Sequence, residues 1–229
     1  LFLLLLKVDS RRCHGVSFAM VVPILWTMIV ASRMVALWLT PSGEFTAPSD
    51  YMEGSPLDRN ILSGLILLGS LIVAHRWQRV GNSFKLNLHV FVFLLFGLLS
   101  VVWADYPLVS IKRWIKALGN IVMVFVVLTE DDPVAAVRNL LRKTAFLLIP
   151  LSILLIKYFP EWGRSYHAYT GHLMYTGVAT GKNGLGLLCM ISGLYFLWEI
   201  KQAKPKRRKT TGATILLIID ATYLFMCLW

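Results

Sequence analysis

The chain has 229 residues, of which 57% are hydrophobic and 15% are charged, and its formal net charge is +11. This apolar content exceeds that of an ordinary soluble domain, so the composition argues against a water-soluble protein and predicts a polytopic membrane protein. The basic residues lie mostly in short connections between apolar blocks, so they indicate membrane topology, and no nucleic-acid partner is expected.

Apolar segments of roughly 20 residues, the length that crosses a bilayer as a helix, follow one another along the chain. We expect an all-α fold, a bundle of about seven transmembrane helices in one integral-membrane domain over residues 1–229. The predicted spans are 16–39, 60–76, 86–104, 111–128, 144–158, 181–199 and 213–229. The polar segment 130–143 is predicted to be a short surface helix with Pro133 in its first turn. Because the chain opens on Leu1 and ends inside an apolar run, we expect the N-terminal portion of a longer protein.

Alternate connections between these spans carry most of the basic residues. This set comprises Lys7, Arg11, Arg12, Arg76, Arg79, Lys85, Arg138, Arg142, Lys143, Lys201, Lys204, Lys206, Arg207, Arg208 and Lys209. Positively charged loops stay on the cytoplasmic side, so the alternation predicts a cytoplasmic N-terminus and a cytoplasmic basic loop at 200–212. Arg59 and Arg164 are the only basic residues in the other connections, which are predicted to face outward. These outer loops are 40–59, 105–110 and 159–180.

A second group of basic residues departs from this pattern, because its members lie in the outer half of the predicted membrane region or just beyond it. The group comprises Arg33, Lys112, Arg113, Lys116, Lys157, Arg164 and Lys182. Cations at membrane depth are costly and usually face a cavity or a partner. One explanation is an outward-facing cavity that binds a polyanion such as a diphosphate. The other is that long side chains extend their charged ends to the interface.

The segment "SIKRWIKALGN" concentrates three of these cations at the outer end of the fourth predicted span. Lys112 and Lys116 are four residues apart, and Arg113 and Lys116 are three apart, so all three share one broad helical face. Like charges on one face repel unless an anion lies between them. The helix N-terminus adds partial positive charge and unpaired N–H groups. The pattern therefore favours an anion site.

Two segments resemble the O-antigen ligase and polysaccharide polymerase superfamily of bacterial envelope proteins, most closely its exopolysaccharide-production members. They are "SVVWADYPLVSIKRWIKALGN" and "YTGVATGKNGLG". In that family the pattern W/Y-x-G-[VI]-x-x-H-K-N-x-L-G marks the outer end of a middle helix. The matching residues here are Tyr175, Gly177, Val178, Lys182, Asn183, Leu185 and Gly186. Gly181 stands at the position of the pattern's His, and the resemblance covers roughly residues 60–200.

This resemblance implies a multi-pass glycosyltransferase of the bacterial inner (cytoplasmic) membrane that needs no metal or other cofactor. Family members take a glycan from an undecaprenyl-diphosphate carrier at the periplasmic face and pass it to a glycan or lipid-linked acceptor. The resemblance thus implies glycan transfer or polymerisation in O-antigen or exopolysaccharide biosynthesis, with membrane lipids as surroundings. It also implies a further outer loop with Arg and His beyond Trp229.

The charge pattern and the resemblance together suggest roles for individual residues. We expect Arg113 and Arg164 to hold the diphosphate, because the guanidinium group grips paired oxygens in bidentate fashion. The supporting substrate-binding candidates are Lys112, Lys116, Lys182 and Arg33. The candidate catalytic residues are Arg164, His167 and His172. Either histidine could take the proton of an acceptor hydroxyl, or each could simply form hydrogen bonds within an aromatic loop.

The remaining polar and aromatic residues of this stretch leave two explanations open. Tyr166, Tyr169 and Tyr175 could stack on sugar rings or belong to an interfacial aromatic belt. Asn183 could bind a sugar or cap the helix that begins near Gly184.

Two other classes of function compete with the glycosyltransferase. One is a polysaccharide or lipid transporter of the flippase kind, which needs polar residues through the full depth of the membrane, including the inner halves of spans. The other is a non-catalytic membrane subunit of an envelope assembly complex.

Overall fold

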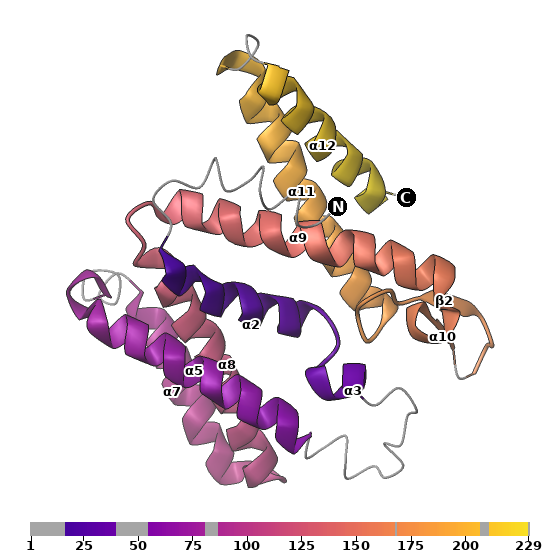
Figure 1. Ribbon diagram of the computed structural model, residues 1–229. Coiled ribbons are helices and arrows are strands. Elements are labelled where there is room, and N and C mark those ends of the chain that lie inside the picture. The colour runs from indigo at the N-terminus through magenta and orange to yellow at the C-terminus, as the bar shows by residue number, and fades with distance from the viewer. Residues whose placement is uncertain (1–16, 40–54, 81–86, 168, 207–210, 229) are drawn as a thin grey trace. The chain divides into compact units, whose positions relative to one another are not determined.

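A computed structural model describes residues 17–39, 55–80, 87–167, 169–206 and 211–228 (Figure 1). The described chain is mostly helical, which confirms the predicted all-α class. One short β-hairpin, which was not predicted, interrupts the helices. Predictions for residues 1–16, 40–54, 81–86 and 207–210 lie outside the described residues.

The helices largely follow the predicted spans. The helical elements are η1 (Phe18–Met20), α2 (Val21–Ala31), α3 (Val35–Leu39), α5 (Pro56–His75), α7 (Leu88–Leu99), η2 (Ser100–Trp103), α8 (Pro107–Leu128), α9 (Pro133–Tyr158), α10 (Pro160–Gly163), α11 (Lys182–Lys206) and α12 (Thr211–Leu228). The strands are β1 (Arg164–Tyr166) and β2 (Leu173–Tyr175).

Three described helices are long and apolar enough to cross a membrane: α5, α9 and the Lys182–Gln202 part of α11. Shorter apolar helices cover Phe18–Ala31, Leu88–Trp103 and Ile218–Cys227. Helix α8 has 22 residues but carries three cations near its N-terminus. These helices support a membrane protein, whereas the full set of seven spans and the orientation remain predictions.

Two sequence-based predictions of helix boundaries are wrong. The predicted span 16–39 is not one helix, because α2 ends at Ala31 and α3 begins only at Val35. The separate surface helix at 130–143 does not exist, because α9 continues to Tyr158. Its predicted start is confirmed: Pro133 is the first helical residue. The Asp132 carboxylate accepts hydrogen bonds from the next two backbone N–H groups, both at 3.0 Å.

The described chain forms two compact units, which we treat separately. The α5–α8 unit contains residues 17–26 and 34–137, and the α9–α11 unit contains 27–33 and 138–228, both with the gaps given above.

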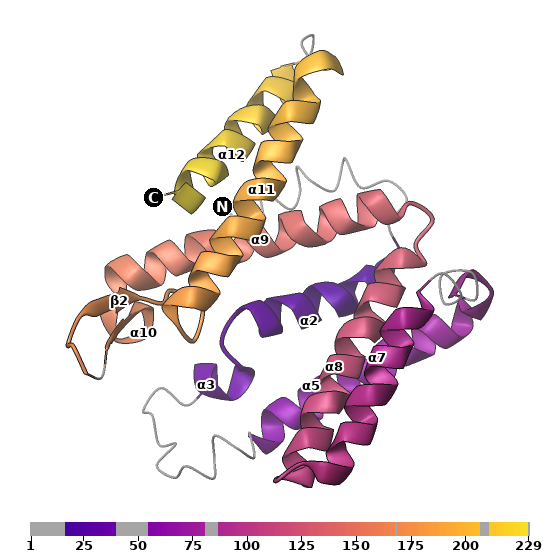
Figure 2. The same ribbon diagram turned by 180° about the vertical axis from the view of Figure 1, so that it is seen from behind.

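Helices α5, α7 and α8 lie side by side in the α5–α8 unit, as both views show (Figures 1 and 2). Helices α5 and α8 run in the same direction, since Gly119 packs against Ile66 and Gly69 against Val122 one turn further on. Small residues at these points let the two helices approach closely. The N-termini of α5 and α8 therefore lie at the same end of the unit.

Helices α2 and α7 run opposite to α8. Phe91, near the start of α7, stacks on Phe125 near the end of α8, and Ser17, just before α2, contacts Glu130 just after α8. Contacts further along α7 and α2 lie nearer the start of α8. On α7, the Leu94 carbonyl accepts a hydrogen bond from the Trp114 indole N–H at 2.9 Å. On α2, the Trp26 indole N–H donates to the Asn120 side-chain oxygen at 2.9 Å. These directions agree with the alternation that the basic connections predict.

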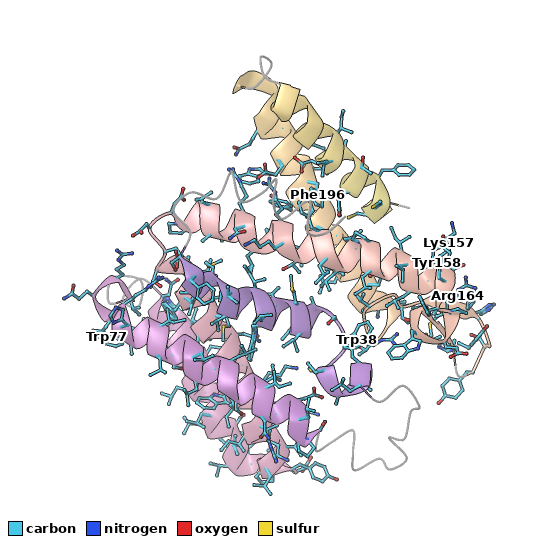
Figure 3. All side chains as sticks on the ribbon, viewed as in Figure 1. Trp38, Trp77, Lys157, Tyr158, Arg164 and Phe196 are labelled. Carbon is cyan, nitrogen blue, oxygen red and sulfur yellow. The ribbon has the colours of Figure 1, made fainter. Side chains whose placement is uncertain are left out.

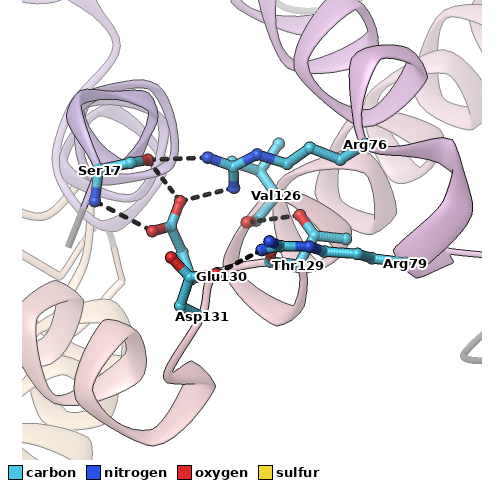
Figure 4. A network of polar contacts seen from close by, with 7 residues as sticks. All are labelled: Ser17, Arg76, Arg79, Val126, Thr129, Glu130 and Asp131. Carbon is cyan, nitrogen blue, oxygen red and sulfur yellow. Dashed lines mark hydrogen bonds and ion pairs between the residues drawn. The ribbon is translucent and has the colours of Figure 1, made fainter. Parts of the chain in front are cut away.

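A polar network lies next to the C-terminus of α8 (Figure 4). The Glu130 carboxylate pairs with the Arg76 guanidinium at 2.6 Å and accepts hydrogen bonds from the Ser17 hydroxyl at 2.6 Å and its N–H at 3.0 Å. Arg79 pairs with Asp131 at 2.7 Å nearby. Burial of Glu130 acts to raise its pKa, but the Ser17 and Arg76 contacts outweigh burial and hold the pKa below its ordinary value of 4.5.

The α9–α11 unit contains a second buried ion-pair network. Helices α9 and α11 run in opposite directions, and Glu199 on α11 pairs with Arg138 at 2.6 Å and with Arg142 at 3.0 Å on α9. The Arg142 side chain is only 3% exposed. Arg138 and Arg142, which were predicted to lie in a cytoplasmic connection, are thus helix residues with an acidic partner.

Aromatic packing joins α12 to the same helices. The rings of Phe146, Phe196 and Tyr223 come from α9, α11 and α12, and the closest pair of centroids, Phe146 and Tyr223, is 4.7 Å apart. The Tyr223 hydroxyl donates to the Phe146 carbonyl at 3.3 Å. Phe196 is fully buried, and Figure 3 shows its place on α11.

Candidate functional site

The N-terminal halves of the parallel helices α5 and α8 line a cavity of about 410 Å³, here named the cationic pocket. Its lining residues are Trp26, Met34, Ser55, Asp58, Arg59, Leu62, Ser63, Ile66, Val109, Lys112, Arg113, Ile115 and Lys116. The prediction that Lys112, Arg113 and Lys116 share one helical face is therefore confirmed. They face this cavity together.

The charges of the cationic pocket are strongly unbalanced. Four cations line it, and Asp58 is the only acidic residue among the lining residues. The Asp58 carboxylate is also engaged elsewhere, because it accepts a hydrogen bond from the Ala36 N–H at 2.9 Å. None of the four cations forms an ion pair with a residue that the structure describes.

The arginines of the two polar networks behave differently. Each of them has an acidic partner: Arg76, Arg79, Arg138 and Arg142. Within the described residues, the four cations that share the cationic pocket thus form no ion pair, while the two networks are neutralised by acidic residues. Within the described part of the chain, an excess of positive charge therefore surrounds this cavity, as an anion site would require.

Sequence reasoning missed Arg59, which was treated as an ordinary loop residue. The structure places Arg59 in the first turn of α5, on the wall of the cationic pocket. A usable signal was present, because the second and fourth predicted spans run in the same direction. Basic residues at their starts, Arg59 and Lys112, therefore had to come to the same end.

The floor of the cationic pocket depends on Gly119. A Cβ atom at this position would lie 2.7 Å from the Trp26 ring and 2.8 Å from the Ile66 side chain, both of which line the pocket. Trp26 is only 3% exposed and is held by its hydrogen bond to Asn120, so it has little room to move.

The diphosphate site predicted from the sequence can be tested here. Gly119→Ala should push the floor into the pocket and weaken the predicted binding of inorganic diphosphate by at least about tenfold, a cost of the size typical of overpacking. Calorimetric titration in detergent micelles measures this binding. Gly64→Ala on α5 is the matched control, because no atom lies within 4 Å of its added Cβ. Equal binding by the two variants would contradict the assigned floor.

A second cavity, of about 510 Å³, lies beside the β-hairpin of the α9–α11 unit and is here named the hairpin pocket. Its lining residues are His167, Thr170, His172, Leu173, Met174, Tyr175 and Lys182. Strands β1 and β2 pair Tyr166 with Leu173, and the His167 N–H then donates to the His172 carbonyl at 3.0 Å. The two histidines are therefore opposite one another in the hairpin, where side chains share a face.

Arg164 lies at the start of β1, beside the end of α9 (Figure 3). Its Nε–H donates to the Ile156 carbonyl at 2.9 Å, and its guanidinium lies 6.0 Å from the centroid of the Tyr175 ring. Arg164 therefore satisfies a carbonyl at the C-terminus of α9 and does not line the hairpin pocket. Its predicted catalytic role stays a prediction.

The tyrosines and the asparagine that were predicted as possible sugar contacts lie in different surroundings. Tyr175 lines the hairpin pocket, whereas Tyr166 and Tyr169 are 72% and 95% exposed. Asn183 is exposed in the first turn of α11, which begins at Lys182, and it forms no hydrogen bond with a described residue. The predicted cap is therefore not seen, and sugar binding by Asn183 remains a prediction.

Arg33 has protein partners in the α9–α11 unit. Its guanidinium donates to the carbonyls of Trp162, Gly177 and Ala179, the last at 3.2 Å, and to the Thr176 hydroxyl at 3.3 Å. We name residues 162–163 and 176–179 the loop junction. Arg33, which was predicted to bind substrate, holds this junction together.

Part of the motif that carries the family resemblance has a structural role in the loop junction. Gly177 has a φ of +55°, and a Cβ there would lie 2.8 Å from the Cβ of Ser152. Val178 is fully buried, and its N–H donates to the Ser152 hydroxyl at 3.3 Å. Only glycine combines this backbone conformation with so close an approach to α9.

No protein-family model, curated protein or solved structure matched the chain in three comparisons. In the described part of the chain, no group of three or more His, Cys, Asp or Glu residues is placed to hold a metal ion.

Proposed function

We propose that this chain is a membrane glycosyltransferase of the O-antigen ligase and polysaccharide polymerase type. It takes a glycan from an undecaprenyl-diphosphate carrier at the outer face of the bacterial inner membrane and passes it to a glycan or lipid-linked acceptor. The observation that carries this proposal is the cationic pocket. Arg59, Lys112, Arg113 and Lys116 line this one cavity, and none of them forms an ion pair with a described residue. The motif resemblance adds independent support.

The chemistry of a lipid diphosphate suits this pocket. A cavity of about 410 Å³ is in the range of small-molecule sites. The N-termini of α5 and α8 point to the same end of the unit and add partial positive charge to that of the side chains. The placement of the pocket near helix starts also suits a head group at the membrane interface.

The predicted topology also fits this proposal. The connections 105–110 and 159–180, which precede α8 and follow α9, carry few basic residues, so the positive-inside rule predicts that both face outward.

In the proposed reaction, an acceptor hydroxyl oxygen attacks the anomeric carbon of the donor sugar. The bond from that carbon to the diphosphate oxygen breaks, and its electron pair leaves with the diphosphate. Fixed cations in the pocket stabilise the negative charge that develops on the leaving group. The proton of the hydroxyl passes to a general base.

The test of this function is Arg113→Ala in the full chain. We expect it to weaken inorganic diphosphate binding by about 10- to 100-fold, the cost of a lost charge-assisted contact, and to lower glycan transfer in cells by a similar factor. Lys201→Ala, which removes one exposed cation at the far end of α11, is the control and should change neither. Normal surface polysaccharide and normal diphosphate affinity in Arg113→Ala would overturn the proposal.

One observation favours a transporter as the second candidate. Arg142, Glu199 and Asp220 are buried within α9, α11 and α12, so polar residues are not confined to the predicted outer half. A scramblase assay in liposomes separates the two functions, using a fluorescent lipid-linked oligosaccharide and no acceptor. Translocation of the lipid by the reconstituted chain would favour the transporter.

A further inference from the structure

The hairpin pocket lies entirely within the α9–α11 unit and carries positive charge of its own. Lys182, in the first turn of α11, lines it, and no carboxylate is among its described lining residues. Lys182 forms no ion pair with a described residue. The surrounding segment 157–182 contains three cations, Lys157, Arg164 and Lys182, against Glu161 alone. The pocket therefore favours a negatively charged ligand.

The two histidines supply hydrogen-bond donors to the same cavity. The Nδ1 atom of His167 accepts hydrogen bonds from the backbone N–H groups of Tyr169, at 3.4 Å, and Thr170, at 3.3 Å. A backbone N–H group is always a donor, so Nδ1 carries the lone pair and the hydrogen of the neutral ring is on Nε2. His172 lies opposite His167 in the hairpin, and every imidazole carries at least one N–H group. This lining suits a ligand rich in acceptor oxygens.

One wall of the hairpin pocket is apolar. Leu173, Met174 and Tyr175 follow one another in β2, and all three line the cavity. Tyr175 is 52% exposed, although the Arg164 guanidinium lies 6.0 Å from the centroid of its ring. The ring thus keeps surface on which a ligand can stack. A small inorganic anion makes no use of such a wall, whereas a sugar ring carries an apolar C–H face beside its polar groups.

We propose that the hairpin pocket binds a carboxylated sugar, a uronic acid residue of a glycan. Its carboxylate lies against the Lys182 ammonium and the imidazole N–H groups, and its ring stacks on Tyr175. A cavity of about 510 Å³ is in the range of small-molecule sites. One lysine matches the single charge of a carboxylate, whereas the cationic pocket offers four cations to a diphosphate. The glycan comes from the proposed function, on which this inference rests, while all the binding residues belong to one unit.

NMR titration of the full chain in detergent micelles with three probes tests this site. The probes are glucuronate, glucose, which has the same ring without the carboxylate, and inorganic phosphate, which has charge without a ring. We expect glucuronate to bind at least about tenfold more tightly than glucose, the gain from one charge-assisted hydrogen bond. Lys182→Gln should abolish this preference, and Lys182→Arg, which keeps the charge, should retain it. Equal binding of the two sugars by the wild type would overturn the inference.

The apolar wall is tested by Tyr175→Ala. Loss of the stacking surface should weaken binding of both sugars by about two- to tenfold and leave any binding of phosphate unchanged. Tyr166→Ala is the matched control, because Tyr166 is an exposed residue of β1 that does not line the pocket. Glucuronate binding that Tyr175→Ala does not weaken would overturn the assignment of a sugar.

Two further measurements separate this inference from the proposed function. Arg113→Ala alters the cationic pocket and should leave glucuronate affinity unchanged, so a loss there would overturn the hairpin site. Lys182-dependent glucuronate binding by a chain that transfers no glycan would leave the hairpin site standing and overturn the proposed function. Glycan transfer by a chain that binds glucuronate no better than glucose would do the reverse.

Discussion

Gly163→Ala is expected to destabilise the α9–α11 unit strongly. A Cβ atom at this position would lie 2.3 Å from the backbone carbon of Leu155 and 2.4 Å from the nitrogen of Ile156. Both are atoms of the α9 backbone, so no side-chain rotation relieves the overlap. The chain after α9 would have to move away from this helix. The hydrogen bonds that the Gly163 carbonyl accepts from the N–H groups of Thr176 and Gly177, at 2.9 and 3.0 Å, would then be disturbed.

We expect this substitution to cost about 3 kcal/mol or more in the free energy of unfolding. For a chain of this length, that lowers the thermal midpoint by roughly 6–12 °C. The midpoint in detergent, followed by size-exclusion chromatography after heating, measures the effect. Gly186→Ala on α11 is the control, since its added Cβ meets no atom within 4 Å and alanine favours the helix. Equal midpoints for the two variants would show that Gly163 does not pack on α9.

Glu130→Ala is expected to have an effect of similar size in the α5–α8 unit. The Glu130 side chain is 2% exposed and neutralises Arg76, whose side chain is 19% exposed. Removing the carboxylate leaves the guanidinium and the Ser17 groups without their shared acceptor. Loss of one partner of such a buried pair costs about 3–5 kcal/mol. Asp131→Ala is the control, because the Arg79–Asp131 pair is exposed and contributes at most about 1 kcal/mol.

The pH dependence of stability tests the same network. The folded-state pKa of Glu130 lies below its ordinary value of 4.5, so the carboxylate stabilises the folded state above about pH 4.5. This contribution is lost as the pH falls through the lowered folded-state pKa. The wild-type midpoint should therefore drop in this acidic window, and Glu130→Ala should show a smaller drop. An identical acid profile in both proteins would mean that the carboxylate is not stabilised as described.

The sequence was sufficient for features that depend on neighbouring residues in the chain. Hydropathy over about 20 residues located α5, α8 and α11, because burial of a continuous apolar stretch is a local property. The i, i+3 and i, i+4 spacing placed Lys112, Arg113 and Lys116 on one face for the same reason. The alternation of basic connections also gave the relative directions of neighbouring helices within each unit.

The tertiary structure alone decided which charges have partners. Arg33 and Arg113 are both basic residues at a predicted outer membrane level, yet Arg33 is held by loop carbonyls, whereas Arg113 lines a cavity and forms no ion pair with a described residue. The acceptors for Arg33 lie more than 100 positions away in the chain, so no local sequence pattern predicts them. Composition and spacing thus determined the membrane class and the excess of positive charge, whereas through-space contacts decided where that charge remains unpaired.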